Sequence, residues 1–169
     1  MPLFLPMTQQ HLTLTYERLH SIEAFPTDEQ TLIRAAQAAC HTAYAPYSGF
    51  WVGAALLLAN GEIVSGSNQE NGAYPSGLCA ERVAFFQASS RYKDVPILKA
   101  AVVAYSPQSG KHLPANPCGG CRQVMVEYEQ KQAQDIGLII LAEPEVYYRF
   151  ERVQTLMPFG FVADFLKQA

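Results

Sequence analysis

Cys79-Ala80-Glu81 and Pro117-Cys118-Gly119-Gly120-Cys121 are the stretches around which this chain is expected to fold. They supply three thiolates and one carboxylate to a single site of the size that a zinc ion needs. A structural zinc site usually takes four protein ligands, whereas a catalytic site keeps one position open for water. Glu81 follows the first cysteine by two residues, where a carboxylate that is not a ligand can move protons. We therefore expect Cys79, Cys118 and Cys121 to bind one catalytic Zn²⁺.

Both cysteine stretches are expected to open helices. Residues 79–92 and 118–130 have helical composition, residues 97–105 and 136–141 are typical of buried strands, and residues 106–116, with two prolines and a glycine, predict a loop. Two helices that lie side by side with their N-termini together would gather the three cysteines. Helix N-termini present free N–H groups and a positive dipole, which lower the pKa of thiols and offset the charge of three thiolates.

The residues before the first motif predict a helix and a hairpin. Thr27-Asp28-Glu29-Gln30 has the form of a capping box, and apolar residues then recur at helical spacing to about residue 44. Residues 51–58 and 62–66 predict two strands, which Asn60-Gly61 would join through a type I′ turn.

The order of these elements predicts one α/β domain. Strand, hairpin, helix, strand, helix and strand make a mixed central sheet covered by helices, which is a three-layer α/β/α sandwich. We expect residues 26–169 to form this catalytic domain and residues 1–25 to form an N-terminal arm. In that arm Leu12, Leu14 and Tyr16 alternate with polar neighbours and suggest a short strand.

The composition favours an oligomer that acts on a small molecule. A chain of 169 residues can bury the core of one domain without disulfides. Its 49% hydrophobic and 16% charged residues indicate that other subunits cover part of the surface. The net charge of -3 provides no electrostatic footprint for a phosphate backbone, so a nucleic-acid partner is disfavoured.

Cysteine use and the first residues indicate a cytoplasmic location. Three of the four cysteines have metal-ligand spacing, which is typical of a reducing compartment, and we expect the fourth, Cys40, to be a buried thiol. His41 and His112 have no matching metal spacing. Residues 1–6 are apolar but lack basic residues and contain two prolines, so we expect neither a signal peptide nor a membrane span.

A family resemblance rests on seven stretches in one order and spacing. They are Ala45-Pro46-Tyr47-Ser48, Phe50, Val52-Gly53-Ala54-Ala55-Leu56, Asn68-Gln69-Glu70-Asn71, Cys79-Ala80-Glu81-Arg82, Pro117-Cys118-Gly119-Gly120-Cys121-Arg122-Gln123 and Leu156-Met157-Pro158. Over residues 30–161 the chain resembles the short, zinc-dependent cytidine deaminases. The N-terminal arm, Trp51 and Gln69 depart from the family's pattern and leave the fine substrate preference open.

The resemblance implies a reaction and a set of residue roles. It implies hydrolysis of cytidine and 2′-deoxycytidine to the uridines with release of ammonia, in pyrimidine salvage, by a homotetramer with one Zn²⁺ per subunit. Glu81 would transfer protons, and Arg82 would offset the charge of the thiolates. The implied substrate-binding residues are Phe50 against the pyrimidine, Asn68 and Glu70 on the sugar hydroxyls, Ala80, and Phe161 in a neighbouring subunit's site.

Most of these roles have a plainer alternative. Asn68 and Glu70 are one residue apart at a strand end and can project from one face, but a polar turn would also contain them. Phe50 and Phe161 could simply pack in the core, and Phe159 competes with Phe161 for the role between subunits. The alternative for Arg82 is a solvated helix residue.

Two other functions stay open. The chain could deaminate a different free pyrimidine derivative, such as a modified nucleoside, an aminonucleoside antibiotic or a nucleotide. Glu70 argues against a nucleotide, because an acidic side chain repels phosphate. The chain could also be a structural zinc module used for binding, and Glu81 with an open metal position argues against that.

Overall fold

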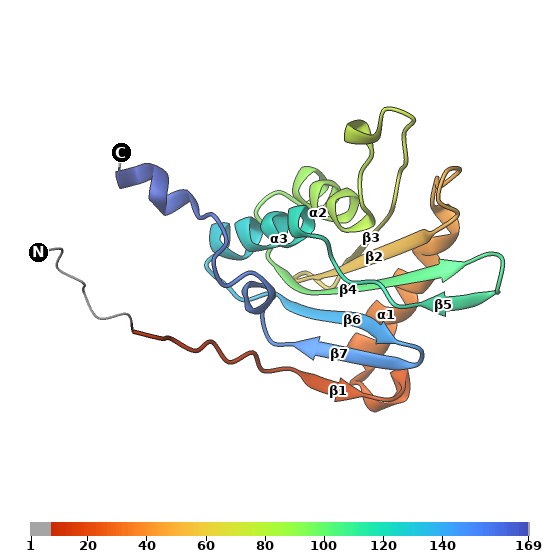
Figure 1. Cartoon of the computed structure of the whole chain (residues 1–169), viewed down its shortest axis with the longest axis horizontal. Coiled ribbons are helices and arrows are strands. Elements are labelled where there is room, and N and C mark those ends of the chain that lie inside the picture. Colours follow the sequence, from red (N-terminus) through yellow and green to blue (C-terminus); the bar gives the residue numbers. More distant parts are fainter. Residues whose placement is uncertain (1–7, 169) are drawn as a thin grey trace, which may run out of the picture.

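The computed structural model describes residues 8–168, which form one mixed sheet with helices on both faces (Figure 1). The strands are β1 (Glu17–Leu19), β2 (Trp51–Leu58), β3 (Ile63–Ser67), β4 (Ile97–Ser106), β5 (Lys111–Leu113), β6 (Gly137–Glu143) and β7 (Val146–Phe150). The helices are α1 (Thr27–Ala39), α2 (Ala80–Arg91) and α3 (Gly119–Lys131), with 3₁₀ turns η1 (Ile22–Ala24), η2 (Cys40–Thr42), η3 (Tyr74–Ser76), η4 (Val153–Leu156) and η5 (Ala163–Gln168). The α/β/α sandwich expected from the sequence is confirmed.

The sheet order places α2 and α3 on one face. Among the described residues the order is β1-β7-β6-β4-β2-β3, and β5 pairs with β4. β4 and β6 are parallel, and the other neighbours are antiparallel. A parallel pair needs a crossover connection, which α3 supplies here. Helix α1 covers the opposite face (Figure 1).

Each face of the sheet buries its own core. Successive residues of a strand point to opposite faces, so Ala100, Val102 and Ala104 of β4 pack under α2 and α3, whereas Ala101 and Val103 pack under α1. Within the described residues, no helix is long and apolar enough to cross a bilayer. The apolar stretch 1–6, for which we expect neither a leader nor a span, lies outside these residues.

Strand β3 fits tightly against the first turn of α2. A Cβ added to Gly66 would lie 2.6 Å from the main-chain nitrogen of Ala84 and 3.0 Å from the carbonyl oxygen of Ala80. Only glycine permits this approach. The contact therefore fixes the start of α2, and with it Cys79 and Glu81, against the sheet.

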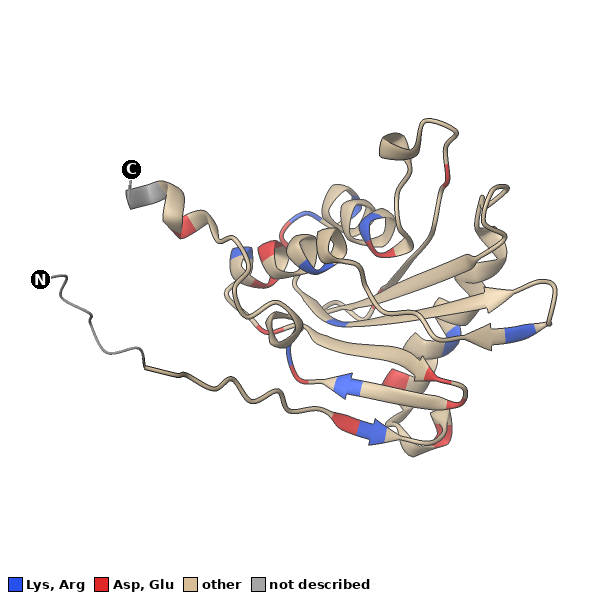
Figure 2. Cartoon of the chain, viewed as in Figure 1, with Lys and Arg blue, Asp and Glu red and all other residues tan. Residues whose placement is uncertain are grey.

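Ion pairs connect β1, β7 and α1 (Figure 2). Arg149 lies 2.6 Å from Glu17 and 3.1 Å from Glu29, and Lys99 lies 2.7 Å from Glu29. The Glu29 side chain is buried, and a buried charge costs stability unless it is paired. Two cations compensate this carboxylate, and Arg149 connects the first strand to α1 through its second pair, with Glu17.

The capping box predicted for α1 does not form. Thr27 is already the first helical residue, and Pro26 occupies the N-cap without a side-chain hydrogen bond. The helix ends at Ala39, and η2 continues the chain to Thr42, short of the predicted residue 44.

The type of turn predicted between β2 and β3 is also wrong. Gly61 has a φ of 85°, but Asn60 has no positive φ, and a type I′ turn needs one at both central residues. The Gly61 N–H donates to the Leu58 carbonyl at 3.0 Å. The connection, residues 59–62, is therefore a short loop with a left-handed glycine at Gly61 and not a type I′ turn.

Three strands differ from the sequence predictions. The strand suggested at residues 12–16 lies instead at 17–19, where β1 pairs with β7. Residues 106–116, predicted as a loop, contain β5. Strand β7, which the sequence did not predict, follows β6 through a tight turn in which Glu145 has a φ of 62°.

Candidate active site

The three predicted cysteines meet where α2 and α3 begin. Cys79 and Cys118 immediately precede α2 and α3, and Cys121 lies in the first turn of α3. The Cys118 sulfur lies 3.9 Å from that of Cys79 and 3.5 Å from that of Cys121. Tetrahedral Zn–S bonds of about 2.3 Å place sulfurs about 3.8 Å apart. All three sulfurs lie within 4.8 Å of one another, so this donor set fits one zinc ion per chain and leaves one position open.

The sulfur cluster has an electrostatic environment that favours thiolates. Arg82 Nη2 lies 3.8 Å from the Cys79 sulfur, and both helix N-termini point at the cluster. The hydrogen bond with Cys121, together with the Arg82 guanidinium, lowers the pKa of Cys79 to about 5. The same contact with Cys79 raises the pKa of Cys121. Arg82 is thus in contact with the cluster and is not a solvated helix residue.

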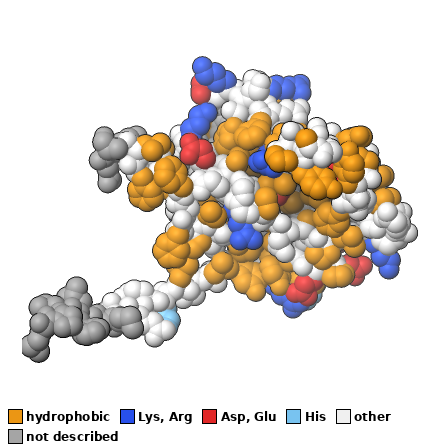
Figure 3. All heavy atoms as spheres, turned by 45° about the horizontal axis from the view of Figure 1, so that its top comes forward, with side chains coloured by type: hydrophobic (Ala, Val, Ile, Leu, Met, Phe, Trp, Pro, Cys, Tyr) orange, Lys and Arg blue, Asp and Glu red, His pale blue; other side chains and the backbone are white. Residues whose placement is uncertain are grey.

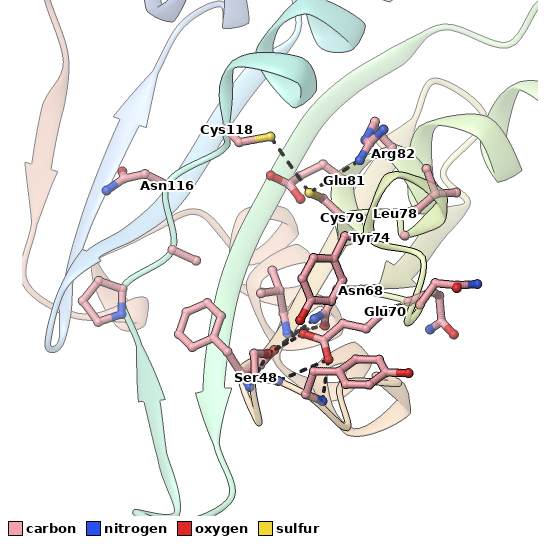
Figure 4. Close-up of a pocket in the computed structure, with 18 residues that line it drawn as sticks. Ser48, Asn68, Glu70, Tyr74, Leu78, Cys79, Glu81, Arg82, Asn116 and Cys118 are labelled. Carbon is pink, nitrogen blue, oxygen red and sulfur yellow. Dashed lines mark hydrogen bonds between the residues drawn. The ribbon is translucent and has the colours of Figure 1, made fainter.

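Glu81 lies beside the cluster with its side chain turned into a cavity (Figure 4). It is 4% exposed, in the first turn of α2. Burial raises the pKa of the Glu81 carboxyl, and the charge on Cys79 raises it further. A buried carboxyl group beside a metal-ligand cluster, with its pKa raised, is a candidate for accepting and returning a proton.

The cavity in front of the cluster has a volume of about 710 Å³. Residues from three segments line it, at 47–52, 68–79 and 114–118, and Glu81 and Arg82 complete the lining. Cavities of roughly 300–1,000 Å³ are typical of small-molecule sites. We call the part at Cys79, Glu81 and Cys118 the zinc end, and the part at Ser48, Asn68 and Glu70 the loop end (Figure 4).

Asn68 and Glu70 both line the cavity, as the strand-end spacing predicts. The Asn68 side chain accepts from the Val52 N–H at 2.8 Å and donates to the Phe50 carbonyl at 2.9 Å. Glu70 accepts from the Tyr47 N–H at 2.9 Å and from the hydroxyl of Ser48. Both residues therefore hold neighbouring backbone while they face the cavity.

The charge of Glu70 is stabilised by these contacts. The Ser48 hydroxyl, and after it the Tyr47 N–H, lower the pKa of the Glu70 carboxyl. The loop end consequently carries a negative charge, which attracts hydroxyl donors and repels phosphate.

The other predicted substrate residues lie in different surroundings. Phe50 is 38% exposed and lines the cavity, so it is not a core residue. Ala80 is fully buried at the start of α2 and does not appear among the described residues that line the cavity. Phe161 is also absent from that lining and, like Phe159, is exposed on the C-terminal segment that stands off the body (Figure 3).

Arg122 and Gln123, the two residues that follow Cys121, bond to the C-terminal part of the chain. Gln123 donates to the Phe161 carbonyl at 2.7 Å and accepts from the Phe161 N–H at 3.0 Å. Arg122 Nη1 donates to the Leu156 carbonyl at 3.4 Å, and Arg122 Nε donates to the Pro117 carbonyl at 2.8 Å. The helix that carries the zinc ligands thus also fixes the direction in which Phe161 leaves the domain.

Sequence reasoning did not assign Ser48, Tyr74 and Asn116, which also line the cavity. Ser48 belongs to one of the stretches that carry the family resemblance, and that was a usable signal. Cys40 is fully buried, as predicted, and burial raises its pKa to about 11. His41 packs against the Tyr105 ring at 4.8 Å, away from the cysteine cluster.

Comparisons with known proteins agree with this geometry. The family model for the cytidine and deoxycytidylate deaminase zinc-binding region matches residues 26–134, which is more than half of the chain. A cytidine deaminase from Halalkalibacterium halodurans is 46% identical over 100 residues, covering 59% of this chain and 71% of the relative. The solved cytidine deaminase from Burkholderia pseudomallei has a TM-score of 0.65 at 36% identity and covers 78% of this chain and 97% of its own. The solved cytidine deaminase from Mycobacterium tuberculosis has a TM-score of 0.63 at 33% identity. It covers 80% of this chain and 98% of its own. This chain belongs to the cytidine deaminase family.

Proposed function

We propose that this protein hydrolyses cytidine and 2′-deoxycytidine to uridine and 2′-deoxyuridine. Water adds its oxygen to C4 of the pyrimidine, the bond from C4 to the exocyclic nitrogen breaks, and ammonia leaves. The observation that carries the proposal is the position of Glu81, buried beside three sulfurs at one end of a nucleoside-sized cavity.

Glu81 performs the proton transfers in this reaction. A bound zinc ion lowers the pKa of water and so supplies a nucleophile near neutral pH. Glu81 takes a proton from the attacking water, delivers it to the ring nitrogen, and assists protonation of the leaving nitrogen. The direction of its pKa shift agrees with this role, because burial and the charge on Cys79 both favour uptake of a proton by the carboxylate. Arg82 offsets part of the thiolate charge, which would otherwise oppose ionisation of the water.

The loop end recognises the sugar. Glu70 carries a negative charge and faces the cavity, so it can accept a hydrogen bond from a sugar hydroxyl. Asn68 lies next to it, and Phe50 offers a ring on which the pyrimidine can pack. Cys79, Cys118 and Cys121 hold the metal. Ala80 is fully buried and lies outside the cavity lining, so its substrate-binding role rests on the family resemblance alone.

The charge of Glu70 favours a nucleoside over a nucleotide. The matching family model includes deoxycytidylate deaminases, whose substrate carries a phosphate. The two substrate classes are distinguished by a panel of pyrimidine nucleosides, nucleotides and bases, followed by ultraviolet absorbance with zinc measured on the same sample. We expect turnover of cytidine and 2′-deoxycytidine with one zinc per chain, and little with the nucleotides or cytosine. Ammonia release from none of these compounds would overturn the proposed substrate and leave a modified pyrimidine derivative or a binding module as the remaining functions.

The quaternary and cellular setting is part of the same proposal. We place Phe161, which the family resemblance assigns this role, in the active site of a neighbouring subunit of a homotetramer; Phe161 and Phe159 are both exposed and outside the cavity lining of their own chain, so Phe159 stays the alternative. Residues 26–169 would form the catalytic domain and residues 1–25 an arm. The enzyme would act in the cytoplasm in pyrimidine salvage, on free nucleosides.

A further inference from the structure

The loop before β2 is attached to the loop end of the cavity by Ser48. The Ser48 hydroxyl donates to Glu70 Oε1 and accepts from the Phe50 N–H at 3.0 Å. The N–H groups of Tyr47 and Ser48 donate to Glu70 Oε2 at 2.9 and 3.3 Å. One hydroxyl therefore contacts both a residue proposed to bind the sugar and the backbone of a residue proposed to bind the base.

These contacts use most of the hydrogen-bonding capacity of Glu70. A carboxylate has two oxygens with about four lone-pair sites. Two N–H groups occupy Oε2, and the Ser48 hydroxyl occupies one site on Oε1. The free site lies on Oε1, and Ser48 determines its direction.

The backbone beneath Glu70 is held as well. The Tyr44 N–H donates to the Asn68 carbonyl at 3.0 Å, and the Glu70 N–H donates to the Tyr44 carbonyl at 2.8 Å. The Glu70 side chain can rotate only if it breaks its bonds to this anchored loop. Binding groups fixed before the ligand arrives increase affinity, because less rotational freedom is lost on binding.

We propose that Ser48 is a positioning residue for substrate recognition. Its hydroxyl directs the free acceptor of Glu70 at a sugar hydroxyl, and the bond that it accepts from the Phe50 N–H holds the hydroxyl in this orientation. The inference rests on the proposed function, which supplies the nucleoside substrate. Ser48 is exposed, as a residue that organises a binding surface would be, and it adds little to the core.

The test compares two substrates that differ only in the sugar. In Ser48→Ala, kcat/KM for cytidine should fall about tenfold, mostly through KM, as expected when one hydrogen bond to a charged group is misdirected. 2′,3′-Dideoxycytidine lacks the ring hydroxyls that Glu70 could bind, so its kcat/KM should change less than about twofold. Ser48→Thr keeps the hydroxyl and should restore most of the activity on cytidine.

A matched control is available at the other end of β2. Asn60 accepts from the Glu62 N–H at 3.2 Å, so Asn60→Ala also removes a side-chain bond to the N–H two residues later. This variant should leave both substrates within about twofold of wild type.

The outcomes separate this inference from the proposed function. Equal losses of Ser48→Ala on cytidine and 2′,3′-dideoxycytidine, or no loss on cytidine, would overturn the role of Ser48 while cytidine deamination stands. Failure of Ser48→Thr to recover would do the same. A wild-type chain that leaves cytidine unchanged would overturn the proposed function and this inference together.

Discussion

The two ends of the cavity are built by different means. At the zinc end the functional groups lie in the first turns of two core helices, and Cys121 and Glu81 are 0% and 4% exposed. At the loop end, Ser48 and Glu70 belong to irregular segments that hold each other through hydrogen bonds near solvent. Core packing fixes the position of the metal-binding and proton-transfer groups, whereas hydrogen bonds between two loops fix the groups that we propose bind the sugar. Changes at the zinc end should therefore act on metal content and kcat, and changes at the loop end on KM and substrate choice.

Removal of a sulfur ligand should have the largest effect at the zinc end. Cys121→Ala should lose zinc and at least about 10⁴-fold in kcat, because the metal is the main electrostatic element of the site. Metal analysis and cytidine turnover measure both. Cys40→Ala is the matched control, since Cys40 is equally buried, and it should retain zinc and activity with only a moderate loss of stability. Full zinc occupancy in Cys121→Ala would contradict the ligand assignment.

Removal of the proton carrier should separate catalysis from metal binding. Glu81→Gln should retain zinc but lower kcat by at least about 10³-fold, since the carboxylate serves more than one transfer. Glu129 is also a buried glutamate, but it accepts the Ile136 and Val153 N–H groups in the interior. Glu129→Gln should cost stability and leave kcat within about threefold. Turnover of Glu81→Gln within tenfold of wild type would remove Glu81 from the mechanism.

At the loop end, loss of Glu70 should change affinity more than rate. Glu70→Ala should lower kcat/KM for cytidine by about 10- to 100-fold, mainly through KM, since a charge-assisted hydrogen bond is worth about 1.5–3 kcal/mol. The value for 2′,3′-dideoxycytidine should be nearly unchanged. A cytidine kcat/KM equal to that of wild type would refute sugar recognition by this residue.

Substitution of Arg82 should reduce activity less than loss of a zinc ligand or of Glu81, because it changes only the charge beside the sulfurs. Arg82→Gln should lower kcat about tenfold while zinc remains bound, because a cation is lost and no ligand is. Arg82 also lowers the pKa of Glu81, so its loss should raise that pKa. The acidic limb of the pH–rate profile should then move to higher pH. An unchanged limb together with an unchanged kcat would leave Arg82 with a packing role.

The smallest expected change in activity concerns Phe161, which lies outside the cavity lining of its own chain. Tetramers made only of Glu81→Gln chains, or only of Phe161→Ala chains, should be impaired. When subunits exchange at random between the two, about a quarter of the active sites should receive Glu81 from one chain and Phe161 from another. Activity should rise above the mean of the two parents. After exchange has been verified by mass spectrometry, activity equal to that mean would show that Phe161 serves its own subunit or only packing.

The zinc end was predictable from sequence because its signals are local. Cys79 and Cys118 stand directly before stretches of helical composition, and Glu81 follows Cys79 by two residues. The loop end was less predictable, because the contact of Ser48 with Glu70 joins residues 22 positions apart and leaves no periodic pattern. The same limit applies to β5 and β7, whose pairing partners decide that they are strands.

The central claim is that this chain uses a metal site of three sulfurs and Glu81 to add water to cytidine. The most direct measurement is incubation of zinc-loaded protein with cytidine in ¹⁸O-labelled water, with uridine and ammonia quantified together. We predict one ¹⁸O atom in each uridine, one ammonia released per uridine, and loss of turnover on zinc removal that one equivalent of zinc per chain restores. Unchanged cytidine in the presence of protein with one bound zinc per chain would contradict the account.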